Sequence, residues 1–457
     1  GAEVAAEFTE VADIYVANAE IDYGDGWDYT AFLSHLAAHP TDTPAALAAQ
    51  EVMFWDAHHL AASSNDTLLR SHVAIDLAKF TDFLSAYGDF TEALLQSELV
   101  TPGQLAHASY FALPAYMNQL ENPGDNPALR DVGLFLARHA SDDTDPVTAA
   151  AANAAKQALD AAILGRSQGT IRESAGQHGV HIQLPLASAM SEELNAAYSQ
   201  LAPSFNAISS WDTILEILRL SNDGVAPVLT ATAKNADQSD AENLPAVLFS
   251  VSDPELAEAQ LELAQYLDPV ARDELVFYGV IAKGAIEADV EYEVSWDGQF
   301  TALPDGAGGL QAVYTRVWED LGSDVNTGEA IEPLLATFGV VVSSDGQEIL
   351  GALLFQDGDA EAGLLTLLDP PVTLPLSQVA SDLPGTTFTP IFFSLSLATG
   401  EQSVLAGSTI PLNRSSVAIS RGSAAAGAYA LVTSATDVFG NVGVDMQPVN
   451  IVDPITP

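Results

Sequence analysis

The hydrophobic pattern of this 457-residue chain changes near Asn222. Before that position, apolar residues recur at helical spacing in segments that alternate with short apolar runs typical of sheet strands. After it, short β-rich runs are separated by turn pairs such as Asp297-Gly298 and Asp345-Gly346. The pattern predicts an α/β domain followed by all-β, sandwich-like modules.

Polar and proline-rich breaks divide the chain further. We expect the α/β part over residues 1–225, a β-rich module over 226–368 and a carboxyl-terminal β-sandwich-like module over 369–457. The last boundary is placed at the break Asp369-Pro370-Pro371. One helix, over Pro254–Tyr266, is expected to interrupt the β-rich half.

The segment from Asp13 to Tyr29 joins a predicted strand to an acidic loop. Ile14–Ala17 is a short apolar run between polar residues, which predicts a buried strand of a parallel sheet. The loop after it carries a group of carboxylates: Glu20, Asp22, Asp25 and Asp28. Because ligands of open α/β sheets bind beyond the carboxyl ends of the strands, we expect this loop to lie at a binding site.

The carboxylates of this loop have three interpretations. They can line a specificity pocket that accepts a lysine or arginine side chain through a salt bridge in a partly desolvated cleft. Asp22, Asp25 and Asp28 can instead coordinate calcium, which prefers clustered oxygen ligands, although their spacing is not that of an EF-hand. The third interpretation is an ordinary acidic turn, in which Asp and Gly are the expected residues.

The chain is strongly acidic, with 62 Asp and Glu residues against 14 Lys and Arg residues and a net charge of -48. This charge excludes non-specific binding to nucleic acid and adhesion to anionic membranes. It is typical of an extracellular or cell-surface protein, and both a high-salt setting and an ordinary acidic secreted protein agree with it. No apolar run is long enough to span a membrane, and no signal peptide is expected at the amino terminus.

The chain contains no cysteine, so it has neither a disulfide framework nor a thiol nucleophile. The nucleophile elbow of hydrolases, the zinc-protease HExxH motif, the P-loop and the dinucleotide-binding glycine motif do not occur either. His178 and His181 flank Gly179, and without a thiol to activate, neither is assigned as a catalytic base. The motifs therefore indicate no competing enzyme class.

Several short motifs follow one another along the first half of the chain: Gly1-Ala2-Glu3-Val4-Ala5, Ala12-Asp13, Val16-Ala17-Asn18 and Gly24-Asp25-Gly26-Trp27-Asp28-Tyr29, and then the segments 72–77, 179–185 and 198–211. In residue type, order and spacing, this set resembles the region just after the nucleophile of clostripain-like cysteine peptidases of family C11. That family has the caspase fold and cleaves after basic residues.

The resemblance implies part of a caspase-like sheet with flanking helices. In such a sheet, Asn18, Glu20 and Asp22 would line the pocket for the Arg or Lys side chain of a peptide or protein substrate. The family's catalytic histidine and cysteine lie upstream of the residues matched here, so a segment before Gly1, or a separate light chain, would supply them. The resemblance requires no cofactor, although some relatives depend on calcium.

The resemblance therefore predicts the large carboxyl-terminal part of a secreted cysteine endopeptidase that is inactive by itself. Because about half of the chain is β module, a function of another class also agrees with the sequence. The alternative is a non-catalytic structural or surface-assembly protein built on a degenerate peptidase domain. The residues directly upstream of Gly1 distinguish the two, since Asp-x-Cys there would indicate the enzyme.

Overall fold

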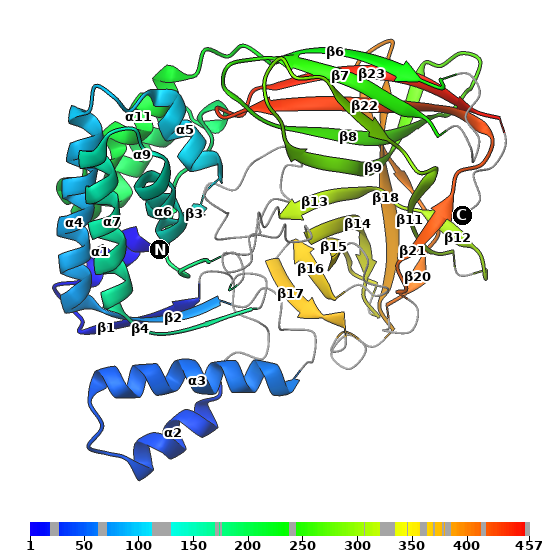
Figure 1. Ribbon diagram of the computed structural model, residues 1–457. Coiled ribbons are helices and arrows are strands. Elements are labelled where there is room, and N and C mark those ends of the chain that lie inside the picture. Colours follow the sequence, from blue (N-terminus) through cyan, green and yellow to red (C-terminus); the bar gives the residue numbers. More distant parts are fainter. Residues whose placement is uncertain are drawn as a thin grey trace. The chain divides into compact units, whose positions relative to one another are not determined.

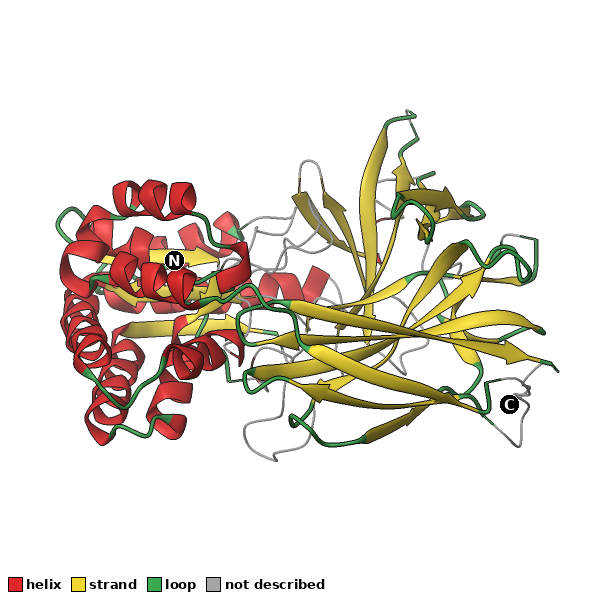
Figure 2. Ribbon diagram, turned by 90° about the horizontal axis from the view of Figure 1, so that it is seen from above, coloured by secondary structure: helices red, strands yellow, loops and turns green. Residues whose placement is uncertain are grey.

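The computed structural model describes residues 1–18, 27–62, 71–111, 129–169, 173, 176–236, 244–305, 307–319, 334–344, 346–356, 363–368, 371–376, 379, 385–412 and 417–452. They form two compact units, the first consisting mainly of Gly1–Gly224 and the second mainly of the residues from Val225 onward. Figures 1 and 2 show a first unit rich in helices and a second built of long strands. The mixed α/β fold with a large β-rich carboxyl-terminal region agrees with the fold class predicted from the sequence.

The first unit alternates helices with short strands. Its helices are α1 Ala2–Phe8, α2 Tyr29–Ala38, α3 Pro44–Ala62, α4 Leu77–Gln96, α5 Pro102–Phe111, α6 Val132–Asp142, α7 Pro146–Ala162, α9 Glu192–Leu201, α10 Pro203–Ser209 and α11 Trp211–Ser221, with a 3-10 turn η1 at Ala187–Ala189. Its strands are β1 Ile14–Asn18, β2 Ser71–Asp76, β3 Leu129–Asp131, β4 Ile163–Gln168 and β5 His181–Gln183.

A sheet of order β1-β2-β4 lies between helices of this unit. Helix α3 packs on one face of the sheet, and α4 and α7 lie on the other (Figure 1). A separate pair, β3 with β5, is antiparallel. The three layers place the end of β1 directly beside α3.

Side-chain caps begin two of the helices, α3 and α4. Thr43 Oγ1 accepts a hydrogen bond from the Ala46 amide at 3.2 Å, at the start of α3. Asp76, which ends β2, accepts the amides of Ala78 and Lys79 at 3.1 and 3.2 Å and begins α4. Both side chains satisfy amides of the first helical turn, and the second cap joins a strand directly to a helix.

The predicted parallel, buried strand at Ile14–Ala17 is wrong in two respects. β1 pairs with β2 in antiparallel register, with Ile14 opposite Asp76 and Asn18 opposite His72, and all of its residues are only partly buried. The connection between these strands, which contains α2 and α3, is long enough for either direction, so the apolar run of β1 alone does not determine it. β1 also lies at the edge of the described sheet, so fewer residues cover it.

The second unit consists of strands. They are β6 Val228–Lys234, β7 Ala246–Ser252, β8 Leu256–Tyr266, β9 Glu274–Ala285, β10 Tyr292–Ser295, β11 Gln299–Pro304, β12 Leu310–Ala312, β13 Thr315–Glu319, β14 Leu334–Val342, β15 Glu348–Gln356, β16 Leu364–Leu368, β17 Pro371–Pro375, β18 Thr387–Ser396, β19 Gln402–Ala406, β20 Ile410–Pro411, β21 Ser420–Ser423, β22 Gly427–Asp437 and β23 Val442–Ile451. The largest described sheet runs in the order β17-β16-β15-β14-β13-β9-β8-β22-β23, and β18 pairs with both β14 and β9.

Two sheets pack face to face in one part of this unit. The sheet β10-β7-β6 lies against β8, β22 and β23 (Figure 1). Val247, Leu261, Leu431 and Val449 fill the space between them, together with the fully buried Trp296. This arrangement agrees with the predicted sandwich-like architecture.

The helix predicted over Pro254–Tyr266 is wrong, because these residues form β8. Its Ala, Glu, Gln and Leu residues favour helices, but alternate side chains are buried, among them Ala257, Ala259, Leu261 and Leu263. Pairing with β9 on one side and β22 on the other outweighs the local helix propensity.

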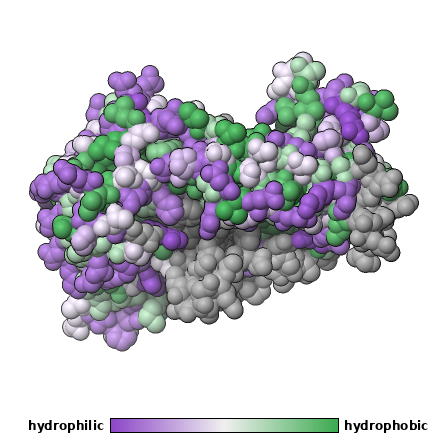
Figure 3. Space-filling view, turned by 45° about the horizontal axis from the view of Figure 1, so that its top comes forward, coloured by the Kyte–Doolittle hydropathy of each residue, from purple (hydrophilic) through white to green (hydrophobic). Residues whose placement is uncertain are grey.

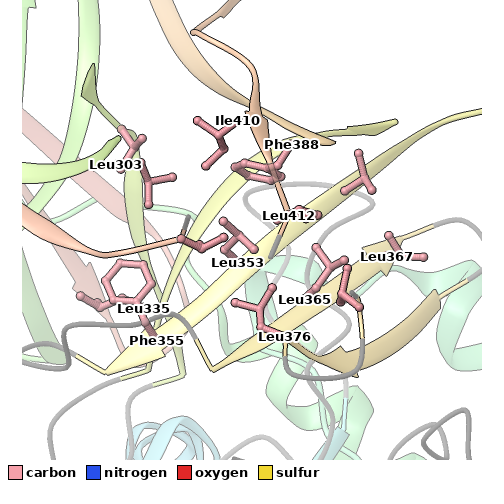
Figure 4. Packing of buried hydrophobic residues seen from close by; sticks show 14 residues of the cluster. Leu303, Leu335, Leu353, Phe355, Leu365, Leu367, Leu376, Phe388, Ile410 and Leu412 are labelled. Atoms are coloured by element: carbon pink, nitrogen blue, oxygen red, sulfur yellow. The ribbon is translucent and has the colours of Figure 1, made fainter. Parts of the chain in front are cut away.

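A second hydrophobic core packs against the sheet that contains β14, β15, β16 and β18. Leu353, Leu365, Phe388 and Ile410 belong to it, and Figure 4 shows these side chains gathered between the strands. The strands on either side of residues 369 and 370 share this sheet, since β14 pairs with β18. The division at residue 369 therefore does not separate two sheets.

The surface of the described residues is mixed in character. Hydrophilic and hydrophobic residues are interspersed over the face drawn in Figure 3. Among the described helices, none combines the length and hydropathy required to cross a bilayer.

Candidate functional site

Three polar residues form a row across the first sheet where β1 ends. Asn18 of β1 is opposite His72 of β2, and His72 is opposite Ser167 of β4. Residues directly opposite each other in neighbouring strands share one face of the sheet. This face carries α3, which contributes further polar groups to the row.

His72 lies at the centre of the row and is completely buried. Its Nε2 atom is 2.8 Å from Oε2 of Glu51 on α3, and Glu51 is 5% exposed. Its Nδ1 atom contacts Oδ1 of Asn18. Glu51, His72 and Asn18 therefore form a hydrogen-bonded series from α3 to the end of β1, and the imidazole fixes the orientation of the Asn18 amide.

Aromatic rings enclose the imidazole. The Trp55 ring of α3 stacks on His72 with centroids 4.7 Å apart and an interplanar angle of 15°. The Trp27 ring meets His72 edge-on at 5.2 Å and 82°. The two indoles exclude water from the His72 hydrogen bonds, which strengthens them relative to exposed ones.

Ser167 extends the row to the far strand. Its hydroxyl donates to Oδ1 of Asp56 at 2.5 Å, and Asp56 also belongs to α3. A second side-chain contact thus joins α3 to the sheet, at the residue directly after Trp55. Both contacts fix α3 to the same face.

A pocket of about 290 Å³ opens beside this row. It is lined by residues of α2, α3 and the segment before α2, mostly aromatic: Trp27, Asp28, Tyr29, Phe32, Leu33, Glu51, Phe54 and Trp55. Trp27, Trp55 and Glu51 belong both to the pocket and to the surroundings of His72. The pocket is therefore a largely apolar hollow with the carboxylates of Asp28 and Glu51 at its wall.

The predicted site residues fall only partly within the described structure. Asn18 lies at the end of β1, as expected, and its amide contacts His72. Glu20, Asp22 and Asp25 lie outside the described residues. Asp28 is the N-cap of α2, where Oδ1 accepts the Ala31 amide at 2.8 Å. One oxygen of the proposed calcium ligand Asp28 is therefore committed to the helix.

The amino-terminal helix α1 is fixed by hydrogen bonds to other elements of the first unit. Oε1 of Glu3 accepts the Gln183 amide at 2.6 Å and the Tyr198 hydroxyl at 3.3 Å. Burial raises the pKa of Glu3, while these hydrogen bonds oppose that shift. Glu3 thus fixes the start of α1 against β5 and α9.

A second polar network surrounds His178, which is 6% exposed. Its Nε2 atom is 3.1 Å from Asp160 and its Nδ1 atom is 3.5 Å from Asp131. Asp131 also accepts the amides of His178 and Gly179 at 2.8 and 3.0 Å. Burial alone lowers the pKa of His178, but hydrogen bonds and charge attraction from Asp131 and Asp160 raise it to about 9. The hydrogen bond from His178 in turn lowers the pKa of Asp160 to about 2.

Sequence reasoning missed Glu51, His72 and the His178 network. His72 lies within a matched motif, but its burial and its partner on α3 depend on how the helix packs. The available signal was weak: a glutamate within the Ala-rich start of α3 and a histidine in an otherwise apolar strand.

Comparison with known proteins gives a family match. The sequence profile of the clostripain family matches residues 1–249. No curated protein matches the chain. One solved structure, a tetra-tandem repeat in the extending region of a large adhesion protein, is 13% identical, covering 50% of this chain and 74% of that one at a TM-score of 0.10. A similarity that low carries no argument about fold or function.

Proposed function

The chain belongs to the clostripain family of peptidases, and on that premise we propose that it is the large carboxyl-terminal part of a secreted cysteine endopeptidase cleaving after Arg or Lys. The catalytic histidine and cysteine come from a segment upstream of Gly1, or from a light chain. Attack by the thiolate, assisted by the imidazole, is the reaction that such a pair performs.

The edge of β1 supports this proposal. Among the described strands, β1 pairs with β2 alone, so its other edge can accept a strand. A strand carrying the nucleophile would complete the sheet there through backbone hydrogen bonds.

The position of helix α1 also supports the proposed function. The helix begins at Ala2, with Gly1 as N-cap. A cysteine placed shortly before Gly1 would lie near the positive end of this helix, which favours the thiolate over the thiol. Glu3 holds that end against β5 and α9, so the helix is fixed where the nucleophile would be attached.

The proposed role of Asn18 is to position the substrate. Its Oδ1 atom contacts His72, and its Nδ2 hydrogens are donors that a peptide carbonyl of the substrate can accept. Glu20 and Asp22, which follow in sequence, would supply the negative charge for the Arg or Lys side chain. The net charge of -48 would also draw cationic peptides toward the protein.

Asp22, Asp25 and Asp28 are proposed as ligands of a calcium ion that the reaction does not require. Since Oδ1 of Asp28 caps α2, only Oδ2 of that residue would be available to the ion. Binding there would tie the acidic loop to the start of α2. Calcium titration of the Asp28→Ser variant, which keeps a capping oxygen, tests this role separately from the cap.

The single observation that carries the proposed function is the Glu51–His72–Asn18 series at the end of the open-edged strand. The test is hydrolysis of an arginyl fluorogenic peptide by the intact native protein, with and without a thiol alkylator. The Asn18→Ala variant should lower kcat/KM by about tenfold to a hundredfold, since misplaced substrate costs that much. The Asn222→Ala variant, altered at the end of α11, is the control and should match the native rate.

Two outcomes would contradict the proposal. If Asn18→Ala and Asn222→Ala hydrolyse the peptide equally well, Asn18 does not position the substrate. Absence of alkylator-sensitive turnover in the intact protein would instead favour a structural or surface-assembly role built on a degenerate peptidase domain.

A further inference from the structure

Two histidines and an aspartate gather at the connection between α2 and α3. His35 lies in the last turn of α2, His39 is its C-cap, and Asp42 precedes α3. Nε2 of His35 is 3.0 Å from Oδ2 of Asp42. One ligand atom from each of the three residues lies within 4.8 Å of the other two.

A hydrogen bond of His39 determines which of its ring nitrogens has the lone pair. Its Nδ1 atom is 3.2 Å from the backbone oxygen of His35. A carbonyl oxygen only accepts, so Nδ1 carries the hydrogen and Nε2 of the neutral ring has the lone pair. A backbone carbonyl bound to one ring nitrogen is the usual support of a metal-ligating histidine, because it fixes the tautomer and leaves the other nitrogen for the ion.

The spacing of His35 and Asp42 suits two ligands of one ion. With metal–nitrogen and metal–oxygen bonds of about 2.0–2.2 Å, neighbouring ligand atoms lie roughly 2.9–3.5 Å apart. The His35–Asp42 separation of 3.0 Å falls in that range. His39 is exposed, so its ring can reorient about the side-chain torsions to complete the set.

The surroundings hold His35 more firmly than His39. The Phe54 ring of α3 meets the His35 ring edge-on at 5.5 Å, and the His35 side chain is 17% exposed. The His39 ring stacks on the His35 ring with centroids 4.4 Å apart. The set thus combines two well-placed ligands with one adjustable ligand at the surface, where an ion can enter.

We propose that His35, His39 and Asp42 bind Zn²⁺ or a neighbouring first-row divalent cation. Two imidazoles and one carboxylate suit Zn²⁺, Cu²⁺, Ni²⁺ and Co²⁺ and disfavour Ca²⁺ and Mg²⁺, which prefer oxygen ligands alone. The bound ion joins the end of α2 to the residue two positions before α3 and so fixes the turn of this helical hairpin. The site is independent of the proposed peptidase function.

The test is calorimetric titration of the complete 457-residue chain with Zn²⁺ after removal of metals by a chelator. Binding of Co²⁺, followed by its visible absorption, reports nitrogen ligation directly. His39→Gln and Asp42→Asn each remove one ligand at an exposed position and should weaken binding of both ions at least about tenfold. His107→Gln, at an exposed histidine of α5, is the matched control and should bind like the unaltered chain.

The circular dichroism of each variant shows whether it is folded, and excess Ca²⁺ should not displace the bound ion. The proposal is overturned if the chain binds no Zn²⁺ at micromolar concentrations. Equal binding by His39→Gln, Asp42→Asn and His107→Gln would overturn it too, because the ion would then be held elsewhere.

Discussion

Nε2 of His72 lies 2.8 Å from Oε2 of Glu51, in a pair whose side chains are 0% and 6% exposed. Glu51 belongs to α3 and His72 to β2, so the pair joins a helix to the sheet it covers. Through the second ring nitrogen the same histidine contacts Asn18. A structural pair thus determines the orientation of the residue proposed to meet the substrate.

Breaking this pair should cost far more than breaking an exposed one. Glu51→Ala leaves His72 buried without its carboxylate and should lower the free energy of unfolding by about 3–5 kcal/mol. Lys79→Ala removes a pair with Asp76 that is 3.9 Å long and largely exposed, so it should cost less than about 1 kcal/mol. Urea denaturation of both variants measures the difference, and similar losses in the two would refute the structural role of Glu51.

The His178 network predicts a specific dependence of stability on pH. Its partners raise the pKa of His178 from 6.5 to about 9, so its stabilisation is complete below pH 6.5 and is lost as the pH rises toward 9. The pKa of Asp160 is lowered from 3.8 to about 2, so its contribution is present above pH 3.8 and is lost as the pH falls toward 2. Both contributions to stability are complete only between pH 3.8 and pH 6.5.

His178→Gln should therefore be less stable than the unaltered chain at pH 5 to 6, with the difference shrinking by pH 9. Thermal unfolding over that range measures it, with His107→Gln as the control for loss of an exposed histidine. A difference that stays constant from pH 5 to pH 9 would show that the charge of His178 contributes nothing.

Replacing each of two glycines of β9 by alanine should have different effects on stability. Gly279 has φ +104° at a β-bulge, and an added Cβ would lie 1.9 Å from the backbone oxygen of Thr315. Gly279→Ala combines backbone strain with overpacking and should destabilise the β unit by about 3 kcal/mol or more. An added Cβ at Gly284 meets no atom within 4 Å, so Gly284→Ala should be neutral or slightly stabilising. Equal unfolding midpoints for the two variants would contradict the close approach of β9 and β13.

Features that depend on local chemistry were predictable from the sequence. Thr43 and Asp76 are polar residues directly before helical patterns, where a side-chain oxygen serves the first free amides. The end of β1 at Asn18 is predictable for a different reason, which is that the apolar run Ile14–Ala17 stops there.

Features that depend on distant contacts were not predictable. β8 has the composition of a helix, and only pairing with β9 and β22 makes it a strand. The antiparallel direction of β1 follows from the return of the chain after α2 and α3, which the residues of β1 do not encode. Glu51 and His72 are 21 residues apart, and nothing local indicates that they meet.

The central claim is that a polypeptide segment outside these 457 residues supplies the thiol that acts beside Asn18. The most direct test compares hydrolysis of an arginyl fluorogenic peptide by the isolated 457-residue chain and by the intact native protein, each with and without a thiol alkylator. The account predicts no hydrolysis by the isolated chain and alkylator-sensitive hydrolysis by the intact protein. Alkylator-sensitive hydrolysis by the isolated chain, or none by the intact protein, would contradict it.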